Sequence, residues 1–97
     1  MSFNNQLNRV SLTGYISSEL ISNNSYSIEF LISVKRKGKP GEKTFTDTFS
    51  VYVSKPDTIA FCKAQLKQNM PVQVKGELRN WVDKSVKICC DEIILKG

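Results

Sequence analysis

Two runs of alternating apolar and polar residues, 26–34 and 44–53, flank a short lysine-rich segment. In the first run, apolar side chains occupy every second position, at Ile28, Phe30, Ile32 and Val34. A repeat of two residues is typical of a β-strand that buries one face and exposes the other. The two runs therefore predict a β-hairpin with the lysine-rich segment at its tip.

The segment at this tip, residues 35–43, holds five basic residues and one acidic residue, a net +4 of the chain's formal +5. Its glycines and its proline favour a turn, while repulsion between its lysines favours an extended loop. A mobile basic loop is suited to close on a polyanion, so we predict nucleic-acid contacts at Lys35, Arg36, Lys37, Lys39 and Lys43. Alternatively, lysines at a hairpin tip only discourage edge-to-edge aggregation.

The composition is that of a folded chain with one small core. Of the 97 residues, 40% are hydrophobic, and this length suffices for one domain, which we expect to span 1–97. No stretch approaches the run of about 20 apolar residues that a membrane span needs, and residues 1–8 have no signal-peptide pattern. Three cysteines, two of them adjacent, form no disulfide framework, as in a reducing compartment. We therefore expect a cytoplasmic protein without a membrane partner.

Before the hairpin, the alternation predicts a first strand from Leu7, after a polar segment, residues 1–6, that is expected to fray. Gly14 in the middle of this run indicates a bulge or a sharp coil, as in a strand that bends around a small barrel. Turn-forming residues at 22–25 are expected to end the strand. The first half of the chain therefore predicts a three-stranded meander.

After the hairpin, the spacing predicts one short helix and two more strands. Apolar residues recur at intervals of three and four over residues 58–68, behind a proline that favours a helix start. Alternation resumes over 71–78 and 85–95, with a turn at 80–84 between them. In the last strand the apolar positions change parity, so we expect a bulge near Asp91.

Three strands, a helix and two strands, β-β-β-α-β-β, is the order of elements in an OB-fold. In that fold five strands form a barrel, and the helix lies between the third and fourth strands. The predicted fold class is therefore all-β with one short helix, a five-stranded OB-fold barrel.

Short segments along nearly the whole chain resemble bacterial single-stranded-DNA-binding proteins. Residues 8–14 and 72–78 resemble the first and fourth strands of that family, and residues 54–55 and 66–67 resemble the end of its third strand and its helix. The resemblance implies an OB-fold that binds single-stranded DNA as a homo-oligomer, a dimer or a tetramer, in replication, repair or recombination. It also implies that Trp81 occupies the position of the family's stacking tryptophan.

The chain also departs from this family. Residues 35–37 are basic where the family often has a tryptophan, and Phe45, Asp47 or Phe49 stands where it has another. The chain ends at Gly97 without an acidic tail of the kind by which those proteins recruit partners. In this respect and in its length it resembles primosomal replication protein N, a dimeric relative of the family.

Single-strand binders combine a basic groove with aromatic faces on which bases stack. Trp81 lies in the expected turn near Arg79 and Lys84, which favours stacking over a place in the core. Tyr52 has the opposite parity to its apolar neighbours, so it faces outward and either stacks or packs on the surface. Lys75, Arg79, Lys84 and Lys87 extend the basic path along the last two strands, although each alone is also explained as a solvated charge.

The other aromatic residues have different expected places. Phe45 and Phe49 share the parity of Val51 and Val53 and are therefore expected in the core. Tyr15 is expected to face outward, where it either binds the ligand or packs in a subunit contact.

The sequence offers little for catalysis or metal binding. The chain has no histidine, and no pair of carboxylates stands out. Cys89 and Cys90 point to opposite faces of a strand, so with Cys62 they are expected to be small apolar fillers. We therefore predict no catalysis, no cofactor and no metal.

Together these features predict a protein that binds single-stranded DNA with little regard to its sequence, through the basic loop and by aromatic stacking. The alternative is a protein-interaction subunit of a primosome or replisome, similar to primosomal replication protein N, with secondary DNA contact. RNA is a third candidate ligand, because stacking and phosphate contacts do not distinguish the sugar.

Overall fold

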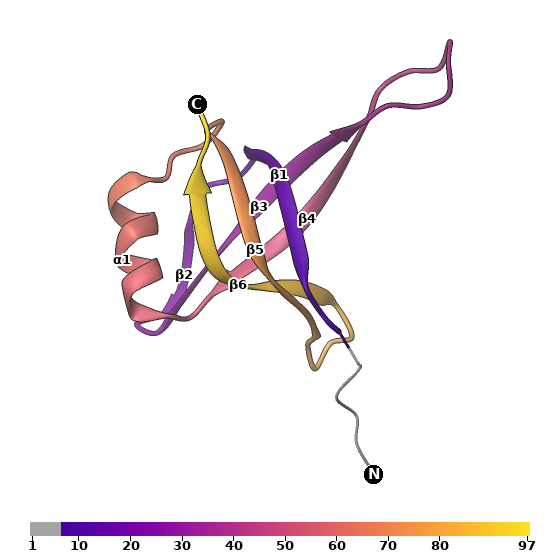
Figure 1. The fold of residues 1–97 in the computed structure, drawn as a ribbon. Coiled ribbons are helices and arrows are strands. Elements are labelled where there is room, and N and C mark those ends of the chain that lie inside the picture. Colours follow the sequence, from indigo (N-terminus) through magenta and orange to yellow (C-terminus); the bar gives the residue numbers. More distant parts are fainter. Residues whose placement is uncertain (1–6) are drawn as a thin grey trace.

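A curved β-sheet closes on itself to form a small barrel, with one helix packed against it (Figure 1). The computed structural model describes residues 7–97, so the predicted fraying of residues 1–6 lies outside the described residues. The elements along the chain are β1 (Val10–Ile16), β2 (Ile21–Asn24), β3 (Ser27–Arg36), β4 (Phe45–Val53), α1 (Pro56–Gln65), β5 (Pro71–Asn80) and β6 (Val86–Leu95). Strands β1, β3, β4, β5 and β6 form the barrel and β2 is an additional edge strand, so the predicted five-stranded OB-fold with one short helix is confirmed.

The barrel closes because β1 pairs with two neighbours. The strands are hydrogen-bonded in the order β1-β5-β6-β4-β3-β2, and the end of β1 also pairs with β3. Gly14 lies where β1 bends toward β3, and a Cβ atom there would overlap the carbonyl oxygen of Ser33. The register with β5 continues through Gly14 without a shift, so this position is a sharp coil and not a bulge.

The first strand is shorter than predicted, because residues 21–24 form a separate strand, β2, that pairs with β3. The turn predicted at residues 22–25 lies at residues 25–26. There the Oδ1 atom of Asn24 accepts a hydrogen bond of 2.7 Å from the backbone N–H of Tyr26. The polar residues of β2 are compatible with a strand because all four of its positions are exposed.

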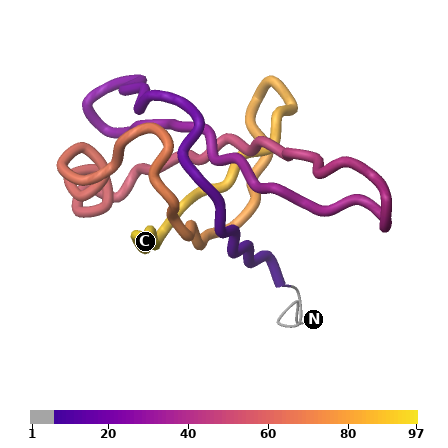
Figure 2. The backbone as a smooth tube through the Cα atoms, turned by 90° about the horizontal axis from the view of Figure 1, so that it is seen from above, coloured from indigo at the N-terminus to yellow at the C-terminus, as the bar shows by residue number. Residues whose placement is uncertain are grey.

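Strands β3 and β4 form the predicted hairpin and extend beyond the barrel as a two-stranded arm (Figure 1). Their pairing continues without a break to Arg36 and Phe45. Strand β3 therefore includes Lys35 and Arg36, and the loop itself is shorter than predicted, at residues 37–44. Figure 2 shows the arm projecting from one side of the barrel, well away from the turn between β5 and β6.

The core fills the inside of the barrel and the space beneath the helix. It is formed by inward-facing side chains of the five barrel strands and by three residues in or next to α1, namely Ile16, Ile28, Phe30, Ile32, Val51, Val53, Ile59, Cys62, Leu66, Val72, Val74, Ile88 and Cys90. The prediction that Cys62 and Cys90 fill apolar space is confirmed, whereas Cys89 is only half-buried and lies outside the core.

The prediction that Phe45 and Phe49 belong to the core is wrong, since their exposed fractions are 43% and 38%. Both residues share the parity of Val51 and Val53, which are fully buried. However, β4 pairs with β6 only over Val51–Val53, so Phe45 and Phe49 lie on the part of β4 that has lost this neighbour. Parity therefore gives the face of the strand but not its burial.

The helix α1 begins and ends earlier than the predicted range of 58–68. Pro56 occupies its first turn, where a proline costs no hydrogen bond. Leu66 already has an extended backbone, and its N–H donates to the carbonyl of Cys62 at 2.9 Å, which closes the helix.

No helix in the described range, 7–97, is long and apolar enough to span a membrane.

The bulge predicted near Asp91 is confirmed. Strands β5 and β6 pair Lys75 with Glu92 and then Gly76 with Cys90, so Asp91 is the extra residue. A Cβ atom on Gly76 would overlap the carbonyl oxygen of Cys89, so glycine permits the close approach of the two strands. The bulge restores the apolar residues of β6 to the inner face on both sides of it.

Candidate nucleic-acid interface

The outer face of four neighbouring strands carries a row of side chains from distant parts of the sequence. Glu29 on β3 lies opposite Tyr52 on β4. Tyr52 is paired in turn with Cys89 on β6, and Cys89 with Glu77 on β5. Paired residues point to the same face of a sheet, and the two neighbours of Tyr52 on β4 are fully buried. The row therefore faces outward, and the predicted outward orientation of Tyr52 is confirmed.

Trp81 folds back from the turn after β5 onto this outer face. Its backbone N–H donates to the carbonyl of Ser85, and its carbonyl accepts from the N–H of Lys84, both at 2.8 Å. The ring centroids of Trp81 and Tyr52 lie 5.1 Å apart with an angle of 68° between the planes, an edge-to-face pair. Trp81 is half-buried and lies outside the core, so part of its ring is available at the surface.

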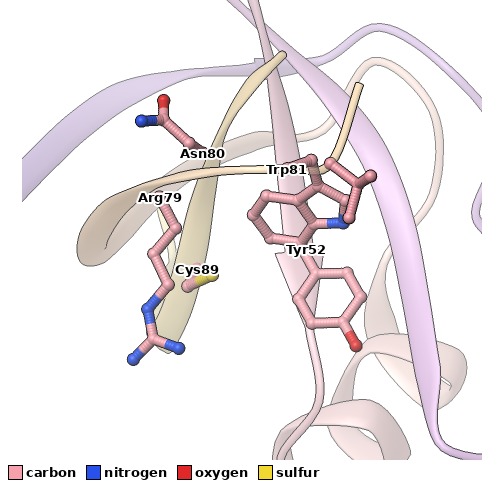
Figure 3. Close-up of a pocket in the computed structure, with 6 residues that line it drawn as sticks. Tyr52, Arg79, Asn80, Trp81 and Cys89 are labelled. Atoms are coloured by element: carbon pink, nitrogen blue, oxygen red, sulfur yellow. The ribbon is translucent and has the colours of Figure 1, made fainter. Parts of the chain in front are cut away.

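A shallow pocket opens beside this aromatic pair and is lined by Tyr52, Arg79, Asn80, Trp81, Val82 and Cys89. Figure 3 shows the rings of Trp81 and Tyr52 together on one side, with Arg79 and Cys89 on the other. Asn80 is directed away from the two rings. The pocket thus brings an aromatic surface next to a cation, the two features with which proteins hold single-stranded nucleic acids.

Carboxylates on the same face hold the cations around this pocket. Arg79 donates through Nε, at 2.7 Å, and through Nη2 to the Oε1 atom of Glu77. Lys87 places its Nζ atom 2.5 Å from Oε1 of Glu29 and 5.0 Å from the ring centroid of Trp81. Arg79 and Lys87 therefore each form an ion pair with an acidic residue of the chain itself.

The remaining predicted cations of β5 and the turn lie in different places. Lys84 is exposed at the tip of the Trp81 turn, with a φ of 69°. The hydroxyl and N–H of Ser85 donate to Oδ1 of Asp83, at 2.6 and 3.0 Å, and these hydrogen bonds lower the pKa of Asp83. Lys75 lies on the other side of the bulge, 3.5 Å from Glu92. Of the two lysines, only Lys84 shares the turn of Trp81.

The basic arm carries a group of cations close together in sequence, most of which form no ion pair. Arg36 is paired with Asp47 at 2.8 Å and places its guanidinium carbon 4.9 Å from the ring centroid of Phe45. The other four cations of the predicted segment are exposed and form no ion pair within residues 7–97, namely Lys35, Lys37, Lys39 and Lys43. The arm therefore presents four lysines without an ion pair within one short segment.

The structure divides the predicted site into two parts at opposite ends of β4. Tyr52, Arg79 and Trp81 meet at the pocket, whereas the loop lysines lie beyond Phe45. Tyr52 lies seven residues along β4 from Phe45, which corresponds to about 23 Å of extended strand. A ligand that contacts both parts must therefore follow β4 along most of its length.

Sequence reasoning missed several residues of this surface. Glu29, Asn80 and Cys89 enter it only because β3, β5 and β6 pair in a particular register, which no local pattern reveals. The exposure of Phe45 and Phe49 had a signal, because the charged residue between them, Asp47, has the same parity. A carboxylate at an expected core position indicates that this part of the strand leaves the barrel.

The thiols are not arranged for chemistry. Burial raises the pKa of Cys62 to about 12 and that of Cys90 to about 11, so both are protonated at neutral pH. Burial also raises the pKa of Cys89. Over residues 7–97, no three histidine, cysteine or carboxylate side chains are grouped so that they could hold a metal ion.

A family model matches nearly the whole chain. It is described as a protein of unknown function (DUF3217) and matches residues 6–96. No curated protein matches the chain.

Solved structures of single-stranded-DNA-binding proteins have the same fold. The mitochondrial protein from S. cerevisiae, Rim1, has a TM-score of 0.75 at 20% identity, with 93% of each chain covered. The Plasmodium falciparum protein, solved with single-stranded DNA, has a TM-score of 0.70 at 18% identity, over 95% of this chain and 96% of the other. The small protein from Mycoplasma pneumoniae has a TM-score of 0.69 at 25% identity, over 92% and 86%.

Proposed function

The chain belongs to the DUF3217 family of unknown function, and we propose that it binds single-stranded DNA with little preference for sequence. The observation that carries this proposal is the half-buried edge-to-face pair of Trp81 and Tyr52 beside Arg79, on the outer face of an OB barrel. The four unpaired lysines of the arm add the charge that a phosphate backbone needs. The fold shared with single-stranded-DNA-binding proteins supports the same ligand class.

In the proposed mechanism the two parts of the surface act differently. Bases stack on the exposed part of the aromatic pair, and each stacked base contributes about 1–3 kcal/mol. The lysines of the arm neutralise phosphates and release counterions. The exposed rings of Phe45 and Phe49 offer further stacking surface next to those lysines. The activity is binding in the cytoplasm by a small homo-oligomer during replication, repair or recombination, and it needs neither catalysis nor a cofactor.

The experiment is a titration with fluorescent oligo-dT of a few dozen nucleotides at several salt concentrations, with the emission of Trp81 followed in parallel. Trp81 is the single tryptophan, so its quenching reports on one place. If about five phosphates are neutralised, log K falls against log salt with a slope of about −3.5. An affinity that does not change with salt contradicts the proposal.

A variant of Trp81 tests the stacking role in the same titration. Trp81→Ala is expected to weaken binding by about tenfold or more, because one stacked base is lost. The domain is expected to stay folded, since Trp81 lies outside the core. Loss of the circular-dichroism spectrum of the wild type would instead make Trp81 a structural residue.

A second candidate function is that of a protein-interaction subunit of a primosome or replisome, similar to primosomal replication protein N. The observation that favours it is apolar exposure on both faces of β3 and β4: Leu31 on the face of Tyr52, and Phe45 and Phe49 on the opposite face, are each more than a third exposed. An exposed apolar surface of this kind serves protein docking as well as stacking. The two functions differ in one simple result: only the first predicts that the protein alone retards an oligonucleotide at physiological salt.

A further inference from the structure

Lys87 is held in place on two sides. Its Nζ atom lies 2.5 Å from Oε1 of Glu29 and 5.0 Å from the ring centroid of Trp81. The side chains of Lys87 and Glu29 are only 18% and 21% exposed, whereas at least one partner of every other ion pair within residues 7–97 is more than half exposed. This pair is therefore the best shielded from water of those in the described chain.

The position of the Lys87–Glu29 pair in the sheet brings it next to the ring of Trp81. Glu29 is on β3 and Lys87 is on β6, and β4 runs between them. Neighbouring strands lie about 4.8 Å apart, so the ion pair between Lys87 and Glu29 spans β4. On β4, Tyr52 is paired with Glu29 and touches the ring of Trp81. Lys87 and Tyr52 thus make two separate contacts with the same indole.

The rest of the turn has little else to hold it. Val82, Asp83 and Lys84 are exposed, and the hydrogen bonds of the turn are made within residues 81–85. Contact with the outer face of the barrel therefore comes through the ring of Trp81. A side chain fixed before the ligand arrives loses less conformational entropy on binding.

We infer that Lys87 and Glu29 are positioning residues that fix the ring of Trp81 against the barrel, and that Lys87 is not a phosphate contact. The inference rests on the proposed function, in which Trp81 stacks on a base. Lys87 thus has a different role from Arg79. The ion pair of Arg79 with Glu77 is more exposed, so Arg79 is free to exchange this carboxylate for a phosphate.

The first test needs no nucleic acid. Lys87→Met keeps the length of the side chain and removes its charge, and time-resolved fluorescence anisotropy then reports the motion of Trp81. Greater local motion of the ring is expected in Lys87→Met, and near wild-type motion in Lys87→Arg, which retains both the cation and the ion pair. Lys63→Met, an exposed lysine of α1, is the matched control and is expected to change nothing. Unchanged motion in Lys87→Met overturns the inference.

The second test uses oligo-dT and the slope of log K against log salt. Positioning predicts that Lys87→Met weakens binding by about two- to fivefold with an unchanged slope, because a cation–π contact is lost but no phosphate contact is. A direct phosphate contact predicts instead a slope that is shallower by about 0.7. That second result overturns the inference.

Glu29→Gln supplies an independent variant in case Lys87→Met does not fold. Glutamine keeps the size of the side chain and removes the charge that retains Lys87. Positioning predicts a more mobile Trp81 and weaker binding. If Glu29→Gln instead tightens binding and steepens the salt slope, Lys87 is a phosphate contact restrained by Glu29, and the inference fails. Should the wild type bind no DNA, the proposed function fails, while the anisotropy of Trp81 still decides whether the pair holds the ring.

Discussion

At the scale of single residues, Cys62 shows how the core affects ionisation. It is fully buried between α1 and the barrel, and burial raises its pKa from 9.0 to about 12. In the unfolded chain the same thiol ionises near 9. The folded state therefore keeps a proton that the unfolded state loses, and the stability that this gives is present in full below pH 9 and is lost as the pH rises toward 12.

We accordingly expect alkaline destabilisation that depends on this residue. Between pH 8 and pH 10 the midpoint of thermal unfolding of the wild type should fall by about 5 °C more than that of Cys62→Ala. The variant should be less stable at pH 8, because it leaves a cavity. Both proteins have the same lysines, so differential scanning calorimetry at the two pH values isolates the thiol. Equal decreases in the two proteins would show that Cys62 plays no part.

Individual residues differ in how far the sequence predicts their place. Trp81 and Tyr52 were assigned to the surface from a turn and from parity, both of which are local properties. Their contact with each other, and with Glu29 and Lys87, depends on which strands are neighbours in the barrel. For Phe45 and Phe49, parity gives the face of the strand but not its burial, and the charged Asp47 between them is the local sign of an exposed strand.

At the scale of elements, the arm formed by β3 and β4 carries charges that contribute little to the stability of the fold. The loop at residues 37–44 lies beyond the barrel, and its lysines are exposed, so they add little to the core. The same lysines repel each other, which favours an extended loop before any ligand binds. Binding and folding should therefore respond independently to changes in this loop.

A triple variant tests this separation. Lys37→Gln, Lys39→Gln and Lys43→Gln together should make the salt slope for oligo-dT shallower by about 2, since each phosphate contact contributes about 0.7. The midpoint of thermal unfolding should stay within about 2 °C, as expected for exposed positions. The matched control replaces Lys63, Lys67 and Lys96, which gives the same net charge at exposed positions near the helix and the C-terminus. If the control weakens binding equally, net charge and not the loop is responsible.

Elements were predictable where their pattern was local. The hairpin, the helix and the bulge at Asp91 follow from periodicity and from a change of parity within one strand. Strand β2 shows no alternation because residues 22–24 are polar and all four of its positions are exposed, and it is a strand only through its pairing with β3. The helix ended early because the backbone of Leu66 already turns toward β5, which the apolar spacing does not reveal.

At the scale of the whole molecule, the two parts of the candidate surface are joined by β4. A strand of nucleic acid with the duplex rise of about 3.4 Å per nucleotide needs about seven nucleotides to cover the 23 Å between Phe45 and Tyr52. Shorter ligands reach either the aromatic pair or the arm, but not both.

The affinity for oligo-dT should therefore depend on length in a defined way. It should rise steeply up to about seven nucleotides and more slowly beyond that, when measured by quenching of Trp81 at low salt. In the triple variant of the loop this rise should be much reduced, because the second contact is lost. A length dependence that is identical in the variant and the wild type contradicts the shared path along β4.

The closure of the barrel also has a consequence for how the protein is made. Val10 pairs with Gly76, so β1 completes its wall with a strand that is synthesised more than sixty residues later. The hairpin of β3 and β4 is local and forms as soon as it has been synthesised, but pairings between distant segments form slowly. Until β5 and β6 have been added, the apolar faces of β1, β3 and β4 stay exposed to water and to other nascent chains. The C-terminal third of the chain therefore sets the moment at which the whole protein folds.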